Sequence, residues 1–247
     1  YAAPITEEDT INEVYALIER RLGAEFKDWF TFELEDADQD YFEISDVDGK
    51  IHIRGNKGVS LTSGLYYYLK YFCEVQITQQ TDTVEFMPET IVPVNETVYK
   101  ATTFDVRYAY NYCTLSYTNA FYGEEDWLRE IDWLALNGVN LVLDTTGQEA
   151  VWIEFLTSIG YSVDDAKSWL TGPSYTAWQF MSNMENYGGP IHDQYVADRL
   201  ELARKNQRMM RALGMDVVLQ GYAGMIPSDY NTVADTTDPD CKAIADA

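Results

Sequence analysis

The first regular pattern of hydrophobic positions along the chain is helical. Apolar residues recur at three- and four-residue spacings between residues 11 and 22, behind an acidic stretch in which Thr6 is placed as the N-cap and Asp9 as its capping-box partner. Gly23 is placed to end this helix. A second helical pattern covers about residues 60–72. We therefore expect two helices in this part of the chain.

Between these helices the pattern changes to an alternation of apolar and polar side chains, which is typical of half-buried strands. The alternating segments are residues 30–35, 41–45 and 50–55. Asp48-Gly49 precedes the last of them and predicts a tight hairpin turn. The helices and strands together predict a small α+β domain over residues 1–101.

After residue 101 strands and helices alternate. Three strands are predicted, each followed by a polar loop, at residues 104–110, 139–143 and 215–219. Helical patterns follow them, at residues 124–136, from about 150, 163–170, 174–181 and 193–213. Residues 235–247 are rich in Asp and Ala and are interpreted as a truncated loop.

This alternation is typical of a (β/α)8 barrel or of a doubly wound sheet. The glycine fingerprint of dinucleotide-binding folds and the phosphate-binding Gly-Lys-Ser loop are both absent from the sequence, which favours the barrel. Residues 102–247 are too few for a complete barrel, which needs roughly 200–250 residues. We therefore predict an α/β chain in which the N-terminal domain precedes the first strand–helix units of a TIM-type barrel, incomplete here.

Composition narrows the class of partner. The chain has 17 basic and 41 acidic residues and a net charge of −24, which argues against nucleic acid and anionic membranes. No apolar run approaches the roughly 20 residues of a membrane span. Cys73, Cys113 and Cys241 lack metal-ligand spacing and only two histidines are present, so no metal site is predicted. Aromatic residues make up 14%, and most of them are expected in the core, although Tyr and Trp also suit sugar binding.

The polar stretch at residues 111–119, Asn-Tyr-Cys-Thr-Leu-Ser-Tyr-Thr-Asn, is the strongest candidate site. It follows a predicted strand, and its side chains suit the rim of a pocket better than a core. From the residue types alone, Glu149 at the end of the next strand is the candidate catalytic acid. Cys113 is not interpreted as a nucleophile, because no base is placed for it.

Several longer motifs resemble glycoside hydrolase family 89, the alpha-N-acetylglucosaminidases. They are Asn-Tyr-Cys-Thr-Leu-Ser-Tyr (111–117), Glu-Ile-Asp-Trp-Leu-Ala-Leu-Asn-Gly-Val-Asn (130–140), Gly-Gln-Glu-Ala-Val-Trp (147–152), Gly-Pro-Ser-Tyr-Thr-Ala-Trp-Gln-Phe-Met-Ser-Asn (172–183) and Gly-Met-Asp-Val-Val-Leu (214–219). The segments at residues 144–146 and 188–192 resemble the secreted bacterial branch more than the lysosomal one. The resemblance covers about residues 101–228.

The resemblance implies a retaining exo-glycosidase that removes terminal α-linked N-acetylglucosamine from glycans or glycoconjugates. This chemistry uses two carboxylates about 5–5.5 Å apart and needs no cofactor. In the family both are glutamates on later barrel strands, so we expect them beyond residue 247 and expect no catalytic residue in this chain. The fragment alone is accordingly expected to be inactive.

The resemblance also assigns candidate binding residues. Those expected to contact the terminal sugar are Asn111, Cys113, Tyr117, Trp178 and Met181. Supporting positions around them are Asp144, Gln148, Glu149 and His192. From the residues alone, the simpler interpretations are capping at a strand end for the first three and a core-facing helix side for Trp178 and Met181.

Two other classes stay open from the sequence. One is a non-catalytic carbohydrate-binding domain that kept the pocket wall, and the other is an unrelated barrel hydrolase acting on a different hexosamine. The chain begins at Tyr1 without Met, as a product of signal-peptide removal would, and its acidic composition is common in secreted proteins. We expect a secreted or extracellular protein of the bacterial type rather than a lysosomal one.

Overall fold

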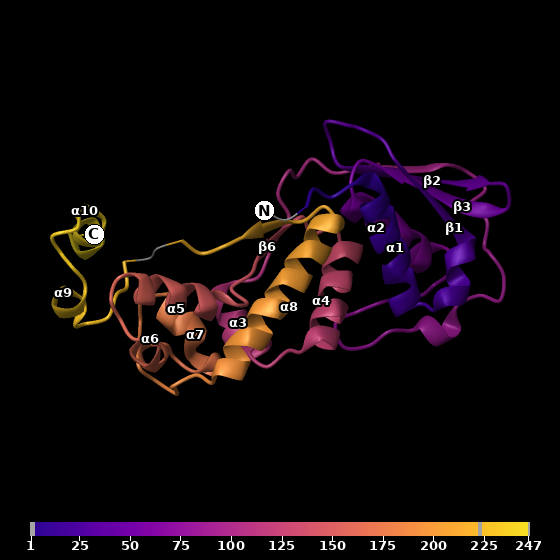
Figure 1. Ribbon diagram of the computed structural model, residues 1–247. Coiled ribbons are helices and arrows are strands. Elements are labelled where there is room, and N and C mark those ends of the chain that lie inside the picture. The colour runs from indigo at the N-terminus through magenta and orange to yellow at the C-terminus, as the bar shows by residue number, and fades with distance from the viewer. Residues whose placement is uncertain (1–2, 222–223, 247) are drawn as a thin grey trace. The chain divides into compact units, whose positions relative to one another are not determined.

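The computed structural model describes residues 3–221 and 224–246 (Figure 1). The chain divides into two compact units. The first comprises residues 1–109, 125–142 and 206–217, and the second comprises residues 110–124, 143–205 and 218–247. The predicted domain boundary between residues 101 and 102 stays a prediction.

A four-stranded sheet in the order β1-β3-β2-β4 forms the base of the first unit. Its strands are β1 (Phe30–Leu34), β2 (Tyr41–Val47), β3 (Lys50–Gly55) and β4 (Val98–Ala101). β2 and β3 form the predicted hairpin, in which Asp48 and Gly49 have φ of 50° and 78°. Two consecutive positive φ values are what a tight right-twisted hairpin requires, and an Asp-Gly pair meets them with little strain.

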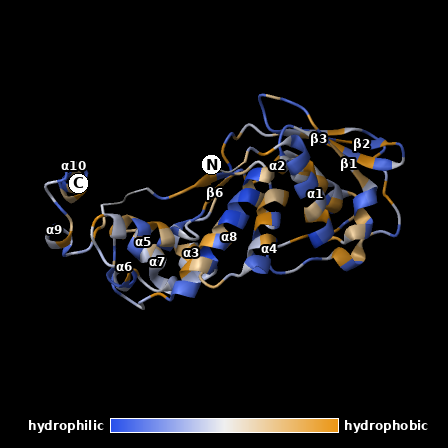
Figure 2. Ribbon diagram, viewed as in Figure 1, coloured by the Kyte–Doolittle hydropathy of each residue, from blue (hydrophilic) through white to orange (hydrophobic). Residues whose placement is uncertain are grey.

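Two helices complete the core of this unit beside the sheet (Figure 1). They are α1 (Glu7–Arg21) and α2 (Gly58–Tyr71), accompanied by the short 3-10 segments η1 (Ala24–Trp29) and η2 (Val84–Phe86). The predicted capping box is present: the Asp9 N–H donates to Thr6 Oγ1, and the Thr6 N–H donates to the Asp9 carboxylate. Hydrophobic and hydrophilic positions alternate along the α1 ribbon (Figure 2), and three hydrophobic side chains of this helix are fully buried: Val14, Leu17 and Ile18.

Helix α4 (Glu124–Leu136) belongs to the first unit from residue 125 onward and is tied to α1 by a buried ion pair. Arg20 Nε and Nη2 bond the two carboxylate oxygens of Asp132 at 3.1 and 2.7 Å, and Asp132 is almost completely buried. A two-point guanidinium–carboxylate contact fixes the relative rotation of the two helices more tightly than a single bond would.

The second sheet has three strands in sequence order, β5 (Tyr108–Ala109), β6 (Leu141–Leu143) and β7 (Asp216–Val218). It belongs to the first unit apart from the last residue of β6 and of β7. β5 and β6 are parallel. Parallel strands in sequence order with helices between them are the beginning of a barrel, and the sheet is not closed in this chain. The predicted mixed α/β class is therefore confirmed.

The strand predicted at residues 104–110 was too long, because only Tyr108 and Ala109 form β5. The Asn140 side chain replaces the missing ladder: its Oδ1 accepts the Arg107 N–H at 2.8 Å and its Nδ2 donates to the Asp105 carbonyl at 2.8 Å. Side-chain bonds of this kind satisfy the backbone without a strand neighbour.

The second unit is built mainly from helices. They are α3 (Tyr112–Tyr117), α5 (Gln148–Ser158), α6 (Val163–Trp169), η3 (Pro173–Tyr175), α7 (Thr176–Phe180), the first part of α8 (Asp193–Ala212), α9 (Tyr230–Val233) and α10 (Pro239–Asp246). α3 packs on α7 and α5 packs on α6 (Figure 1). Their core includes the buried side chains Leu156, Trp169, Leu170 and Tyr230.

Two loop predictions in this unit were wrong. Residues 111–119 contain helix α3, and residues 235–247, interpreted as a loop, contain helix α10. The start of α10 is capped, because Asp238 Oδ1 accepts the N–H groups of Asp240 and Cys241 at 2.9 and 3.2 Å. Of the polar loop predicted after the third strand, positions 222 and 223 lie outside the described residues.

Candidate functional site

The candidate stretch begins with a helix cap. Asn111 has extended backbone angles, and its Oδ1 accepts the N–H of Thr114 at 3.0 Å, so this side chain starts α3. The capping interpretation of Asn111 therefore describes its intramolecular role. Cys113 and Tyr117 follow at a four-residue spacing on α3, which places them on one side of the helix.

Tyr117 and Trp178 come together although they are far apart in the sequence. Their ring centroids lie 5.2 Å apart with the planes at 72°, an edge-to-face contact between α3 and α7. Tyr117 is 71% exposed and Trp178 is half-buried, so the pair presents aromatic surface to solvent. Met181 follows at the end of α7, where its N–H donates to the Ala177 carbonyl at 3.0 Å.

Ser116 holds this pair in place. Its hydroxyl is buried and accepts the N–H of Ala177 at 2.8 Å, which joins α3 to the first turn of α7. A buried backbone N–H needs such a partner, since leaving it unpaired costs about 1–3 kcal/mol. The sequence carries no local signal for this role of Ser116, because its partner lies 61 positions away.

The predicted supporting residues Asp144, Gln148 and Glu149 lie where β6 leads into α5. Asp144 is fully buried, and its Oδ1 accepts the Thr146 N–H at 2.9 Å. Gln148 Nε2 donates to the Gln220 carbonyl at 3.5 Å, a long contact. The structure thus places all three in the second unit, with Asp144 and Glu149 facing away from solvent.

Glu149 has the most perturbed environment among these residues. Burial raises the pKa of its carboxyl to about 7, and the charge of Asp144 adds to this, while Arg199 opposes it. Its Oε2 has no hydrogen-bond partner among the residues that the structure describes. The Glu149 carboxyl is therefore largely neutral only at pH values well below 7.

Arg199 of α8 is a supporting residue that the sequence did not reveal. Its Nη1 donates to the Tyr122 carbonyl at 2.6 Å and its Nη2 to the Ala120 carbonyl at 3.4 Å. The guanidinium also lies 5.1 Å from the ring centroid of Tyr195. Arg199 thus anchors the segment that follows α3. No local sequence signal marked it, because its helix carries many charges.

His192 is placed apart from this cluster of contacts. It is exposed, and its Nδ1 accepts the N–H of Gln194 at 3.2 Å at the start of α8. This contact helps to begin the helix, and a role of His192 in supporting the sugar site stays a prediction.

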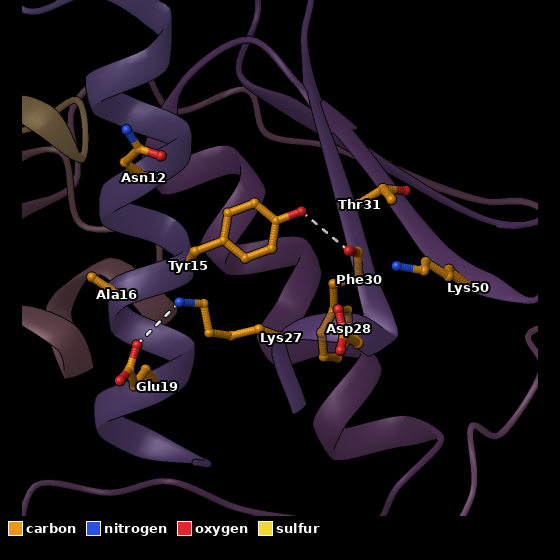
Figure 3. Close-up of a pocket in the computed structure, with 9 residues that line it drawn as sticks. All are labelled: Asn12, Tyr15, Ala16, Glu19, Lys27, Asp28, Phe30, Thr31 and Lys50. Atoms are coloured by element: carbon orange, nitrogen blue, oxygen red, sulfur yellow. Dashed lines mark hydrogen bonds and ion pairs between the residues drawn. The ribbon is translucent and has the colours of Figure 1, made fainter. Parts of the chain in front are cut away.

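A separate cavity of about 340 Å³ lies in the first unit between α1, η1 and the strands β1 and β3 (Figure 3). Its polar groups bond one another: Tyr15 donates to the Phe30 carbonyl at 3.1 Å, and Lys27 pairs with Glu19 at 3.0 Å. None of the predicted site residues lines it. The candidate site is therefore the aromatic pair of the second unit.

Among residues 3–221 and 224–246, no group of three or more His, Cys, Asp or Glu side chains is arranged to hold a metal ion. The helices of the same residues are too short or too polar to cross a bilayer.

The fold and the site together define the class. A four-stranded sheet with two helices, followed along the chain by a sheet of parallel strands with intervening helices and a polar, aromatic segment after its first strand, is typical of the N-terminal part of a (β/α) barrel protein. Residues 107–240 match the alpha-N-acetylglucosaminidase tim-barrel domain, and residues 12–94 match the N-terminal domain of the same proteins. The chain belongs to the alpha-N-acetylglucosaminidase family, glycoside hydrolase family 89.

Individual relatives agree with this assignment. Human alpha-N-acetylglucosaminidase is 34% identical over 184 residues, which are 74% of this chain and 25% of the human protein. The family 89 glycoside hydrolase from Clostridium perfringens, solved with 2-acetamido-1,2-dideoxynojirimycin, is 45% identical with a TM-score of 0.89, over 92% of this chain and 26% of that one. A variant of that enzyme with two Glu→Gln substitutions was also solved with its substrate GlcNAc-alpha-1,4-galactose. The chain thus spans about a quarter of these relatives and is closer to the bacterial one.

Proposed function

We propose that the complete protein containing this chain is a retaining exo-glycosidase that removes terminal α-linked N-acetylglucosamine from glycans or glycoconjugates. The observation that carries this proposal is the match to the family's barrel domain across residues 107–240. The relatives support it, because the human protein is named for this activity and the bacterial enzyme binds GlcNAc-alpha-1,4-galactose as its substrate.

In this proposal the chain recognises the terminal sugar and leaves bond cleavage to a glutamate pair beyond residue 247. Retention requires a nucleophile and a general acid/base about 5–5.5 Å apart. Glu149 does not serve as either in this proposal, because its carboxyl is enclosed. A buried acid without access to the sugar cannot protonate a leaving group.

The residues proposed to contact the terminal sugar are Asn111, Cys113, Tyr117, Trp178 and Met181. Tyr117 and Trp178 offer exposed aromatic faces and edges that match the apolar face of a sugar ring. Asn111 lies at the start of α3, the helix that carries Tyr117, and is exposed. In the proposed complex its amide group hydrogen-bonds the sugar hydroxyls.

The test uses the complete protein with aryl α- and β-N-acetylglucosaminides. We expect turnover of the α anomer and retention of its configuration in the first-formed product. Preferred cleavage of the β anomer, or an inverted product, would contradict the proposal. The 247-residue chain is expected to give no turnover, and activity of this piece would refute the placement of both glutamates.

The alternative is a carbohydrate-binding domain without catalysis. Binding of N-acetylglucosamine by the complete protein, without cleavage of any α-linked substrate, would establish that alternative. The family assignment favours the enzyme, because the matched domain is the barrel of hydrolases.

We further propose that the protein is secreted or extracellular. Its net charge of −24 and its greater similarity to the bacterial relative support this proposal. Detection of the protein in the culture medium of its source, against a cytosolic marker enzyme, tests it; retention inside the cells would contradict it.

A further inference from the structure

The exposed aromatic surface of the second unit extends beyond the Tyr117–Trp178 pair. Tyr175 lies 6.4 Å from Trp178 between ring centroids, and Tyr187 lies 4.6 Å from Tyr175 with the planes at 87°. Tyr187 is 55% exposed although it is a large aromatic residue. Tyr175 and Trp178 are half-buried, so the row has two exposed rings joined by two partly covered ones. Single exposed aromatics are common, but a connected row of four rings at a proposed sugar site calls for a ligand.

The outer end of this row is held rigidly by backbone contacts. The Tyr187 carbonyl accepts the Gly172 N–H at 2.9 Å, and the Asn186 N–H donates to the Trp169 carbonyl at 3.0 Å. The indole N–H of Trp169 donates to the Glu185 carboxylate. The segment that carries Tyr187 is therefore fixed at residues 185–187.

Gly172 and Gly188 allow the backbone at residue 172 to lie close to the backbone at residues 187–188. A Cβ on Gly172 would lie 2.4 Å from the Gly188 carbonyl oxygen, and a Cβ on Gly188 would lie 3.1 Å from the Tyr175 ring. Gly188 also has φ of +74°, which disfavours other residues. The tyrosine pair thus depends on a tight backbone crossing, and a rigid aromatic surface loses little entropy when it binds a ligand.

We propose that Tyr175 and Tyr187 form a platform for the sugar to which the terminal N-acetylglucosamine is attached. This inference rests on the proposed function, which places the terminal sugar at Tyr117 and Trp178. Aromatic rings pack against the apolar faces of sugars, and the row continues directly from the terminal-sugar residues.

The charges beside the platform favour a neutral hexose in this position. Glu185 lies two residues before Tyr187, and its carboxylate, which accepts the Trp169 indole N–H, adds negative charge to this segment. Lys167, whose backbone lies near Gly189, is already paired with Asp193 at 2.8 Å and with Asp164 at 3.6 Å. The negative charge of a uronic acid or a sulfated sugar would be repelled by the Glu185 carboxylate and would find the Lys167 ammonium already paired. The platform therefore suits an uncharged partner sugar better.

The test compares two substrates of the complete protein. GlcNAc-alpha-1,4-galactose carries a second sugar, whereas α-N-acetylglucosaminyl fluoride has none. We expect Tyr187→Ala to raise KM for the disaccharide roughly three- to tenfold, the effect of losing one aromatic contact, and to leave the fluoride constants unchanged. Tyr187→Phe keeps the ring and should retain most of the disaccharide affinity.

A matched control is Tyr71→Ala, which removes another exposed tyrosine, 65% exposed, at the end of α2. It should change neither substrate. Unchanged disaccharide kinetics in Tyr187→Ala, or an equal loss on both substrates, would overturn the platform while leaving the proposed function standing. Absence of turnover in the unmodified protein would overturn the proposed function itself.

The preference for a neutral sugar is tested with GlcNAc-alpha-1,4-glucuronic acid. We expect a lower kcat/KM than for the galactose disaccharide, with the difference reduced in Tyr187→Ala. Faster cleavage of the glucuronic acid disaccharide would refute the charge argument.

Discussion

The buried carboxyl of Glu149 allows a direct test of the electrostatics in the second unit. Glu149→Gln preserves the size and shape of the side chain and removes its titration. The carboxyl is enclosed, with 5% of its residue surface exposed, and burial is the main cause of its raised pKa. The substitution should therefore change how stability depends on pH more than it changes the fold.

The sign follows from proton binding. The pKa of Glu149 is raised from its ordinary value of 4.5 to about 7 on folding, so between these values the folded protein holds a proton that the unfolded chain has lost. The contribution of Glu149 to the stability of the unmodified protein is greatest below the lower value and falls as pH rises through this range. The full loss is about 3 kcal/mol, because one pKa unit corresponds to about 1.36 kcal/mol.

The assay is urea denaturation followed by tryptophan fluorescence, since Trp152 and Trp169 both lie in the second unit. At about pH 4.5 the two proteins should have similar free energies of unfolding, and at about pH 8 Glu149→Gln should be the more stable one by up to ~3 kcal/mol. Parallel pH profiles would show that folding leaves the pKa of Glu149 unshifted, and a variant less stable at the higher pH would show that Glu149 is ionised and favourably paired in the folded protein. Either result would refute the reasoning. Asp240→Asn, an exposed acid in α10, provides the control for a general loss of charge.

Three further substitutions test the site. Ser116→Ala leaves the buried Ala177 N–H without its partner and should lower the free energy of unfolding by about 1–3 kcal/mol, measured by denaturation; a change under about 0.5 kcal/mol would refute the role of this bond. Gly172→Ala places a Cβ 2.4 Å from the Gly188 oxygen and should lower the melting temperature, whereas Gly221→Ala, with open space around its Cβ, should not; equal melting temperatures would contradict the tight crossing. Trp178→Ala should raise KM for aryl α-N-acetylglucosaminide in the complete protein roughly tenfold, and an unchanged KM would remove Trp178 from the sugar site.

Long periodic elements were predictable from the sequence because their signals are local. The apolar spacing and capping box of α1 and the Asp48-Gly49 turn each lie within a few neighbouring positions, and the structure confirms them. The predicted strand before Tyr110 was too long because the Asn140 side chain, from a later segment, satisfies its backbone. Such a replacement leaves no pattern in the strand itself.

The contacts of the candidate site could be predicted only in part. Tyr117 and Trp178 were found through the resemblance of their motifs, and their contact is now visible. Arg199 bonds Tyr122 across 77 positions, and no single segment carries a signal for this pairing. The cap at Asn111 had a local signal, an Asn before a short helical segment, but the polar stretch was interpreted as a loop.

The side-chain oxygen of Asn111 caps the start of α3, so two requirements restrict which residues can replace Asn111 in the proposed enzyme. A replacement must cap a helix of six residues, and it must also present suitable groups to the sugar. Asp meets the first demand without the second, because it keeps the capping oxygen and loses the amide donor. In relatives with changed sugar preference, we therefore expect Asp or Ser at this position more often than an apolar residue. Specificity can then change without loss of the helix that carries Cys113 and Tyr117.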